Sequence, residues 1–509
     1  MNGKNKLPQL PKGWAWTTLK EIAKRLQSGG TPSTKVKGFY EGGTIPFVKI
    51  EDMVNAKKHL WQTSTKITEE GLKDSSAWIV PENSLLYSMY ASYGIPIINR
   101  MEVATNQAII VLIPPDQLVS VDYLYYLLWS MKPSLRQYIR GTTQENLNAA
   151  IVSSLPIALA PLPEQHRIVA KIEELFSDLD AGVAALQKIQ TQLKRYRQAV
   201  LKAAVEGKLT AEWRAAHRGE IEPASALLER IRAERAKNAN SKAKPLPCVD
   251  AAELGALPEG WDWVTLQELS WDAGYGTSVK CDYGFDGAAV LRIPNIAKGR
   301  IDLTDLKCAS NSDSAHFDPT ESLATGDLLI VRTNGSRDLI GRAALVSRDF
   351  DSPHYFASYL IRFRLMNLEC LPLWINTFWD STRNRAWIEG VAATTAGQYN
   401  VSMTVLNKMP VPLPPLAEQQ QIVAEVERRL SVADEVERTV DASLKQAERL
   451  RQSILKRAFA GKLVPQDPND EPAERLVERI RAARDLTGIT KSVRSGKHRA
   501  TQSQRKKSR

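Results

Sequence analysis

The sequence predicts two mixed α/β (α+β) globular domains separated by an antiparallel coiled coil of two long helices, with the chain built as an internal repeat. The first observation is an opening motif: Leu-Pro-Lys-Gly-Trp-Ala-Trp-Thr-Thr-Leu at residues 10–19 returns at 257–266 as Leu-Pro-Glu-Gly-Trp-Asp-Trp-Val-Thr-Leu. The second is a segment that starts at Glu164 and returns at Glu418 (418 − 164 = 254), in register as far as Gly-Lys-Leu at 207–209 and 461–463. Between these signatures the halves differ almost everywhere. Repeated flanking segments around dissimilar sequence predict two domains of different binding specificity, held in one symmetric arrangement.

The size and charge of the chain suit a multidomain protein with a polyanionic partner. A chain of 509 residues is too long for one core, and its 43% hydrophobic and 25% charged content is ordinary for globular proteins. The net charge of +11 favours nucleic acid as a partner. Charge by itself leaves a protein without such a partner equally open, so the motifs must decide.

The cysteines and the apolar runs indicate a reduced, cytoplasmic protein. Cys248, Cys281, Cys308 and Cys370 form no Cys-x-x-Cys pair, so free thiols are favoured over a zinc site or a disulfide framework. The first ten residues contain no apolar signal region, and no apolar run reaches about 18 residues. We therefore expect neither secretion nor a membrane span.

The first domain is expected over residues 1–163. Trp14 and Trp16 alternate as in a strand, and residues 28–33 form a turn-rich loop. The runs 45–50 and 108–113 are expected to be strands, and 121–131 and 134–139 to be helical. All four tryptophans of the opening motifs, Trp14, Trp16, Trp261 and Trp263, are expected in the core.

A long helix and its linker are expected over 164–247. Apolar residues from Ile168 to Val200 alternate spacings of four and three for about five heptads, which is the seam of a coiled coil. Gly207 is placed to end this helix, whose length is about 60 Å at 1.5 Å per residue. The copy over 415–485 has a weaker seam, with Arg429 and Ser443 at seam positions. We expect the two helices to pack on each other; the alternative is that each lies on its own domain.

Shorter elements follow each long helix. Residues 223–232 and 472–481 are similar and are expected to be short amphipathic helices, and 237–244 a polar linker into the second domain, 248–414. The tail, 486–509, is basic and expected to be disordered.

These features resemble the specificity (S) subunits of type I restriction–modification enzymes, over the chain as far as about residue 485. The resemblance rests on the two opening motifs, the loop at 28–33, the stretches 274–280 and 326–336, Gly341-Arg342, and the paired Pro-Leu-x-Glu-Gln helix starts. It implies that two target recognition domains each read half of a bipartite site in double-stranded DNA. It also implies that the helices set the spacing and dock two methyltransferase (M) subunits, and that restriction/translocation (R) subunits join them. The M subunits of the family methylate adenine with S-adenosylmethionine, and the S subunit performs no chemistry.

The repeat adds a geometric expectation to the resemblance. Antiparallel pairing of two equivalent helices creates a pseudo-twofold axis, and the strands of DNA are antiparallel too. Two domains related by such an axis could bind two half-sites on one duplex, and the length of the helices would set the distance between the half-sites. Since the two domains differ, the target is expected to be asymmetric.

Candidate DNA-binding residues are basic, amide or aromatic side chains in glycine-broken loops, because Arg and Lys suit guanine, and Asn and Gln suit adenine. In the second domain these candidates are Lys280, Arg332, Asn334, Arg337 and Arg342, and in the first they are Lys35, Lys37 and Tyr40. Ordinary solvated charge is the alternative for each. Tyr87, Tyr90 and Tyr93 are expected to pack rather than contact bases. The matching pairs Gln144/Asn146 and Gln398/Asn400 are expected to be structural, because two different readers would not share base contacts.

The repeated pairs Glu164-Gln165 and Glu418-Gln419 are expected to start the long helices, and they are candidates for contacts with a partner bound twice.

No catalytic motif is present in the sequence. It contains no Gly-x-x-x-x-Gly-Lys-[Ser/Thr] nucleotide loop, no Asn-Pro-Pro-aromatic motif, and no metal-ligand spacing of His, Cys and carboxylates. We therefore expect a non-enzymatic, DNA-binding subunit that needs neither cofactor nor metal. The alternatives are a coiled-coil scaffold with two peptide-binding domains and, less favoured, a self-contained nuclease.

Overall fold

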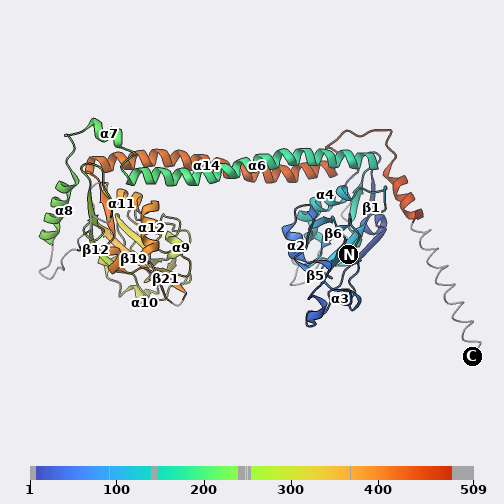
Figure 1. The fold of residues 1–509 in the computed structure, drawn as a ribbon, viewed down its shortest axis with the longest axis horizontal. Coiled ribbons are helices and arrows are strands. Elements are labelled where there is room, and N and C mark those ends of the chain that lie inside the picture. Colours follow the sequence, from blue (N-terminus) through green and yellow to red (C-terminus); the bar gives the residue numbers. More distant parts are fainter. Residues whose placement is uncertain are drawn as a thin grey trace, which may run out of the picture. The chain divides into compact units, whose positions relative to one another are not determined.

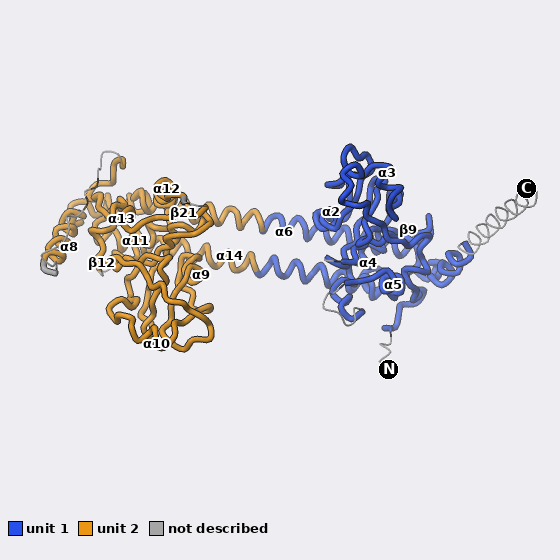
Figure 2. The backbone as a smooth tube through the Cα atoms, turned by 90° about the horizontal axis from the view of Figure 1, so that it is seen from below, with its two compact units in different colours: residues 1–186, 442–509 blue, residues 187–441 orange. Residues whose placement is uncertain are grey.

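A computed structural model describes residues 7–483 except 91, 139–145, 239–246, 248, 250–253, 367, 369 and 396. The chain folds into two compact units (Figure 2). Unit 1 contains residues 1–186 and 442–509, and unit 2 contains residues 187–441. The basic tail and Gln144 lie outside the described residues.

Unit 1 is built on two sheets and a short antiparallel frame. In the frame, β1 (Ala15–Thr18) pairs with β10 (Pro156–Leu159), and α1 (Leu19–Ile22) follows β1. The larger sheet has the order β2 (Arg25–Ser28), β9 (Ile109–Ile113), β6 (Leu85–Ser88), β7 (Pro96–Asn99), β4 (His59–Leu60). The smaller sheet has the order β5 (Thr65–Ile67), β3 (Ile45–Val48), β8 (Ala104–Thr105).

Apart from the two long helices that it shares with unit 2, unit 1 has short helices, and one of them, α4 (Val121–Met131), covers the larger sheet. The others are η1 (Lys37–Phe39), α2 (Ile50–Asn55), α3 (Glu69–Lys73), η2 (Lys132–Tyr138) and α5 (Ala149–Ser153). α4 begins where Ser120 accepts a hydrogen bond from the Tyr123 amide. It lies between the sheet and the long helix α6 (Leu162–Val205) in one apolar core (Figure 1). The expected strand at 45–50 ends at Val48, and the expected helix at 134–139 is the 3₁₀ helix η2.

Unit 2 repeats this plan with a different outline. β11 (Asp262–Thr265) pairs with β22 (Pro410–Leu413). The main sheet has the order β12 (Ser270–Tyr275), β19 (Leu360–Leu365), β15 (Asp327–Val331), β17 (Ala343–Leu345). Two three-stranded sheets follow: β14 (Lys307–Cys308), β13 (Ala289–Leu291), β18 (His354–Phe356), and β16 (Thr333–Asn334), β21 (Gln398–Asn400), β20 (Ala393–Thr395). The helices are α9 (Ile293–Ile296), α10 (Asn311–Ser314), η4 (Pro319–Glu321), α11 (Leu371–Trp379), α12 (Thr382–Val391) and α13 (Met403–Asn407).

Two 44-residue helices, α6 (Leu162–Val205) and α14 (Leu416–Phe459), each contribute to both units. In unit 1 the start of α6 pairs with the end of α14, where Arg451 bonds to Asp180. In unit 2 the end of α6 pairs with the start of α14, where Arg197 lies 2.6 Å from Asp434. Moving from Asp180 to Arg197 along α6 takes the partner back by the same seventeen residues, from Arg451 to Asp434. The predicted antiparallel pair is confirmed.

The first turns of each long helix also pack on that helix's own domain, which was the alternative expectation. Ile168 and Ile172 are buried in the core of unit 1, and Ile422 and Val426 in that of unit 2, so each helix begins on its own domain. Farther along, seam residues are only partly covered: Ile189 and Tyr196 of α6 are 36% and 43% exposed.

Each long helix ends as expected at a glycine and is followed by a helix that docks on the other copy's opening motif. Gly207 and Gly461 have φ of +64° and +65°. After α6 and α7 (Ala211–Ala216), the amide of Ala224 in α8 (Ala224–Asn238) donates to Gly260 O at 2.8 Å. After α14, residues 473–483 are helical and the amide of Ala473 donates to Gly13 O at 2.8 Å. The expected linker at 237–244 begins inside α8; its remainder lies outside the described residues.

Candidate nucleic-acid interface

The repeated Glu-Gln pairs anchor each domain from inside. In unit 2 the Glu418 carboxylate accepts hydrogen bonds from Trp261 Nε1 (2.8 Å), Thr210 Oγ1 (2.6 Å) and Arg214 Nε (3.1 Å). In unit 1 Glu164 Oε2 accepts one from Trp14 Nε1 at 3.0 Å. The sequence indicated that helices start here, but it did not predict that each helix start bonds to the tryptophan of an opening motif.

The burial of these pairs bears on their expected partner role. Gln165 donates to Ala160 O at 2.8 Å, and Gln419 to Pro414 O at 2.9 Å. The four side chains of the two pairs are at most 1% exposed. They therefore leave almost no surface for another protein to contact, and their contacts give them a structural role within the chain.

Only half of the expected tryptophan core is buried. Trp14 and Trp261 are 5% and 6% exposed. Trp16 and Trp263 are half-buried, and each donates Nε1 to a backbone carbonyl, that of Pro8 or Gly255. Full burial was therefore wrong for these two, although Trp16 still packs against the core of unit 1.

In unit 2, Arg332 lies at the centre of a cluster of loops. Its guanidinium carbon lies 4.5 Å from the centre of the Tyr275 ring, and Nη1 donates to Ser358 O at 3.4 Å. Its Nε is buried without a partner among the described residues. Arg332 follows β15 directly, and Tyr275 ends β12, so two strands of one sheet bring the pair together. A guanidinium stacked on a ring is oriented, and it retains donors of the type that read guanine edges.

Two further segments lie beside Arg332. In β16, Asn334 pairs with Tyr399 of β21, and its Oδ1 accepts from the Ser336 amide at 2.8 Å, which fixes a turn. The segment that carries the exposed Lys280 begins at Gly276, where an added Cβ would lie 2.0 Å from Phe356 O. Thr277 O then accepts from the Ser358 amide at 2.8 Å. Thus the structure brings Arg332, Asn334 and the Lys280 loop together around Ser358 and β16.

The side chains of Arg337 and Arg342 make their contacts elsewhere. Arg337 lies 3.5 Å from Glu389 of α12, and Arg342 Nε donates to Asp338 O at 3.1 Å. Both are exposed, but the charge of Arg337 is compensated by a carboxylate. Neither side chain joins the Arg332 cluster through a contact in the described part of unit 2.

In unit 1, the candidates lie on a clamped turn. Gly29 and Gly30 pack so closely that an added Cβ would lie 1.9 Å from Thr105 O and 2.2 Å from Ser76 Oγ, respectively. Tyr40 OH donates to Pro32 O at 2.7 Å, and partial burial raises the pKa of this phenol. Lys35 and Lys37 are exposed between these fixed points.

The two units differ at the position of Arg332. Val401 N donates to Arg332 O at 2.9 Å, and Leu147 N donates to Met89 O at 2.9 Å; Leu147 and Val401 are 254 residues apart (401 − 147). Met89 thus takes the place of Arg332 in unit 1. Tyr87 is buried in unit 1, as expected for packing, whereas Tyr90, next to Met89, is 38% exposed. Gln398 accepts from Thr333 Oγ1 at 3.4 Å and Asn400 pairs with Thr333, contacts that suit the structural role expected for this pair.

The residues that sequence reasoning missed are Tyr275 and Ser358. Tyr275 stands inside the stretch 274–280 that the resemblance used, but nothing in the sequence linked it to a residue 57 positions later. Within the described residues, no group of three or more His, Cys, Asp or Glu side chains could hold a metal ion. No helix in the same part of the chain has the length and hydrophobicity needed to cross a membrane.

Comparisons with known proteins agree with these features. Residues 11–195 match the family model described as the type I restriction modification DNA specificity domain. The chain is 26% identical over 514 residues to the type I restriction enzyme EcoKI specificity subunit of Escherichia coli K12, covering 96% of this chain and 98% of that protein. It is 24% identical to the StySPI specificity subunit of Salmonella potsdam, with coverage of 96% and 98%.

A solved structure shares the fold. A chain from work on complex assembly and conformational transition of the type I R-M system aligns with a TM-score of 0.62 and 19% identity, over 90% of this chain and all of that chain.

Proposed function

The chain belongs to the family of type I restriction–modification specificity subunits, and from this we propose that it is the subunit that selects the DNA sequence for such a complex. The chain is not itself an enzyme. Methylation of adenine and cleavage of DNA reside in the partner subunits with which it assembles. We propose a cytoplasmic location, where such a complex meets DNA.

The observation that carries this proposal is one frame repeated around two different loop clusters. Both units anchor the opening tryptophan on a buried glutamate and dock a short helix on the opening motif. Yet one unit offers Arg332 on Tyr275 where the other has Met89. Because the frames match and the loops do not, we propose that each unit reads a different half of an asymmetric, bipartite target with a nonspecific spacer.

We propose that Lys280, Arg332 and Asn334 contact DNA in unit 2, and Lys35 and Lys37 in unit 1. Arg332 is the strongest choice for reading a base edge because the Tyr275 ring orients it. Lys35, Lys37 and Lys280 are exposed on loops that close glycine packing holds in place, which suits contacts with phosphate. Arg337 and Arg342 are proposed as flanking contacts, and Tyr40 as a positioning residue that holds the lysine turn.

The partly covered seam of the long helices supports docking of partner subunits. In unit 1 an open hollow of about 720 Å³ lies between α6 and α14, lined by apolar residues such as Leu175, Leu179 and Leu450. In unit 2, Ile189 and Tyr196 of α6 and Val432 and Val436 of α14 are exposed. A pair of helices with such a stripe has apolar area left for further helices. We propose that these surfaces, rather than the buried Glu-Gln pairs, bind the two M subunits, and that the R subunits join through that complex.

Single-molecule methylation sequencing of the host, with and without this gene, tests the proposal. The expected result is loss of one gapped, asymmetric adenine-methylated motif when the gene is deleted and its return on complementation. An unchanged methylome in a host that expresses the M subunits would contradict it.

A further inference from the structure

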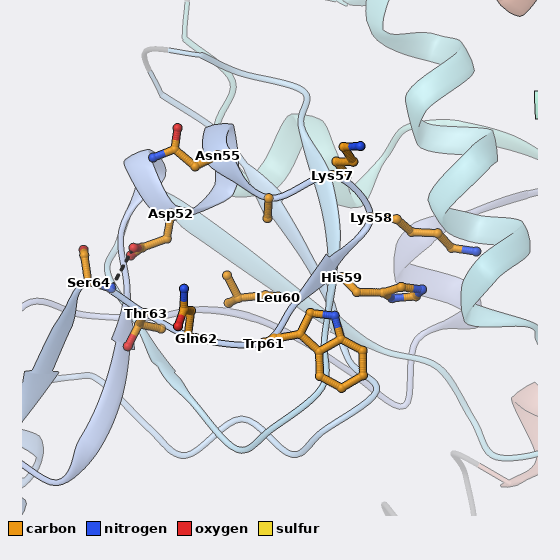
Figure 3. A pocket seen from close by; sticks show the side chains of 11 residues that line it. Asp52, Asn55, Lys57, Lys58, His59, Leu60, Trp61, Gln62, Thr63 and Ser64 are labelled. Carbon is orange, nitrogen blue, oxygen red and sulfur yellow. Dashed lines mark hydrogen bonds between the residues drawn. The ribbon is translucent and has the colours of Figure 1, made fainter. Parts of the chain in front are cut away.

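Unit 1 has a hollow at the edge strand β4 that none of the proposed DNA contacts uses. Its volume is about 770 Å³, and it is lined by Asp52 and residues 55–64 (Figure 3). These residues come from the end of α2, from β4, and from the segment that leads to β5. Its lining combines an aromatic ring, exposed amides and basic side chains.

Trp61 presents an open aromatic face at this hollow. Its side chain is 70% exposed, whereas Leu60 before it is 3% exposed and packs in the core, because successive residues of a strand point to opposite sides. An indole buries a large apolar area when it is covered, so leaving one in water forgoes that stabilisation. The neighbouring His59 ring meets it edge-on, with centroids 6.2 Å apart and planes at 67°. Figure 3 shows the two rings side by side.

Positive charge near Trp61 lacks a counter-charge among the described residues. Arg100 donates from Nε to His59 Nδ1 at 3.1 Å and from Nη1 to Asn83 Oδ1. Asn83 is uncharged. Burial, followed by Arg100 and Lys58, lowers the pKa of His59, which accepts the Arg100 bond at Nδ1 and so adds no counter-charge. Lys57 is exposed at the rim, without an ion pair in the described part of the chain.

The segment that forms the hollow is held at both ends. Tyr125 OH donates to Lys57 O at 3.1 Å, and Lys58 Nζ lies 2.6 Å from Asp122 and 2.5 Å from Glu173. At the other end Asp52 Oδ1 accepts from the Ser64 amide at 2.9 Å. Trp61 and Lys57 are therefore presented from a backbone that is already ordered, and binding would cost little further ordering.

We propose that this hollow binds a nucleotide of a DNA strand whose base is not stacked in a duplex. The base stacks on Trp61, Lys57 at the rim contacts its phosphate, and the exposed amides Asn55 and Gln62 face its hydrogen-bonding edge. Arg100, which bonds to His59 behind the hollow, adds positive charge without contacting the nucleotide. Stacking on an aromatic side chain is the recurring way in which proteins bind unpaired bases, since every base has a π-face. A base inside an intact duplex hides both faces, so the ligand is an opened or single-stranded position. This inference rests on the proposed function, since it assumes that DNA is the ligand of unit 1.

The test measures binding of two fluorescent ligands to the full chain. One is a single-stranded oligothymidine, and the other is a duplex that carries the methylated motif found in the host. Free adenosine monophosphate is the competitor. Trp61→Ala is expected to weaken binding of the single strand about tenfold or more, and Trp61→Phe to retain most of it. Lys57→Gln is expected to weaken the same binding and to lower the slope of its salt dependence by about 0.7, as for one phosphate contact. Trp271→Ala, which removes a partly exposed tryptophan from unit 2, is the matched control and is expected to bind as the unchanged chain does.

The possible results separate this inference from the proposed function. Single-strand binding by Trp61→Ala equal to that of the unchanged chain would overturn the inference, as would equal losses in Trp61→Phe and Trp61→Ala. Free nucleotide that displaces the strand at similar concentration would overturn the assignment to DNA. A chain that binds its motif duplex while failing these tests keeps the proposed function. A chain that binds neither duplex nor single strand loses both.

Discussion

The Nε1 of Trp261 donates a 2.8 Å hydrogen bond to Oε2 of Glu418, a fully buried carboxylate 157 residues farther along the chain. Trp14 and Glu164 repeat this bond in unit 1 at 3.0 Å. The surroundings differ, however. Glu418 also accepts from Thr210 and Arg214, whereas Glu164 Oε1 is buried without a partner among the described residues. Two bonds of the same kind therefore stabilise their units unequally.

Glu418→Gln is expected to destabilise unit 2 by about 2–4 kcal/mol, because it leaves the largely buried Arg214 guanidinium without its counter-charge. Hydrogen–deuterium exchange of peptides from β11 and β22 measures the loss locally. The control is Glu425→Gln on the same helix, whose partners Arg428 and Arg429 are on the surface, with an expected cost below about 1 kcal/mol. Equal effects of the two variants would show that the buried network contributes nothing special.

Glu164 predicts a pH dependence confined to unit 1. Burial raises the pKa of this carboxyl above its ordinary value of 4.5, while the Trp14 hydrogen bond and Arg167 oppose the shift. A group whose pKa is higher in the folded state stabilises fully below its unfolded pKa, and this stability is lost as the pH rises through the folded pKa. We expect the opening free energy of β1 and β10 to fall as the pH rises from about 4.5, and Glu164→Gln to flatten the fall. Exchange rates corrected for intrinsic pH dependence would refute this if the two slopes coincide.

The sequence determined the helical frame well because that frame is periodic and repeated. The spacing of apolar residues from Ile168 to Val200 predicted the coiled-coil seam, and Gly207 predicted where the helix ends. Both signals are local in the sequence. The docking of each short helix on the other copy's opening motif could not be predicted, since two similar motifs leave open which copy each helix meets. The contact of Arg332 with Tyr275 was equally hidden, because a pair of loop residues has no period and Met89 replaces Arg332 in the repeat.

Arg332→Gln is expected to relax or change recognition at one position of one half-site, while the other half of the motif is unchanged. An arginine that reads a guanine edge contributes about 1–3 kcal/mol of discrimination, or roughly 5- to 150-fold. Methylation sequencing of a host with the variant measures it. Arg348→Gln is the control, since this exposed arginine follows β17 at the opposite end of β15 from Arg332. Weaker methylation with an unaltered motif would reassign Arg332 to a phosphate contact.

Replacing glycine by alanine is expected to have opposite effects within α6, at Gly182, and just after it, at Gly207. Gly207 has φ of +64°, and an added Cβ would lie 2.5 Å from Pro258 Cγ, so Gly207→Ala is expected to cost about 1–2 kcal/mol or more. Gly182 is in the middle of the helix with no atom within 4 Å of an added Cβ, so Gly182→Ala is expected to stabilise by about 0.5–1 kcal/mol. Thermal unfolding of the two variants measures both. A loss of stability in Gly182→Ala would mean that this position is not free in the folded chain.

The lengths of α6 and α14, which both continue from one unit into the other, are expected to set the distance between the two half-sites. Their antiparallel register places Leu186 opposite Lys445, because Asp180 meets Arg451. We therefore expect one added heptad to be accommodated when it is inserted after Leu186 and also after Leu444. Seven residues extend a helix by about 10 Å, close to the rise of three base pairs.

Methylation sequencing of a host with this double insertion is expected to return both original half-sites with a spacer about three base pairs longer. Methylation should be weaker, because three base pairs turn the DNA by about 100° whereas a heptad hardly rotates the seam. Insertion into α6 alone shifts every pair beyond Leu186 and should abolish methylation. An unchanged spacer in the double insertion would mean that helix length does not set the distance between half-sites. Altered half-site sequences would mean that the domains do not read DNA independently of the helices that carry them.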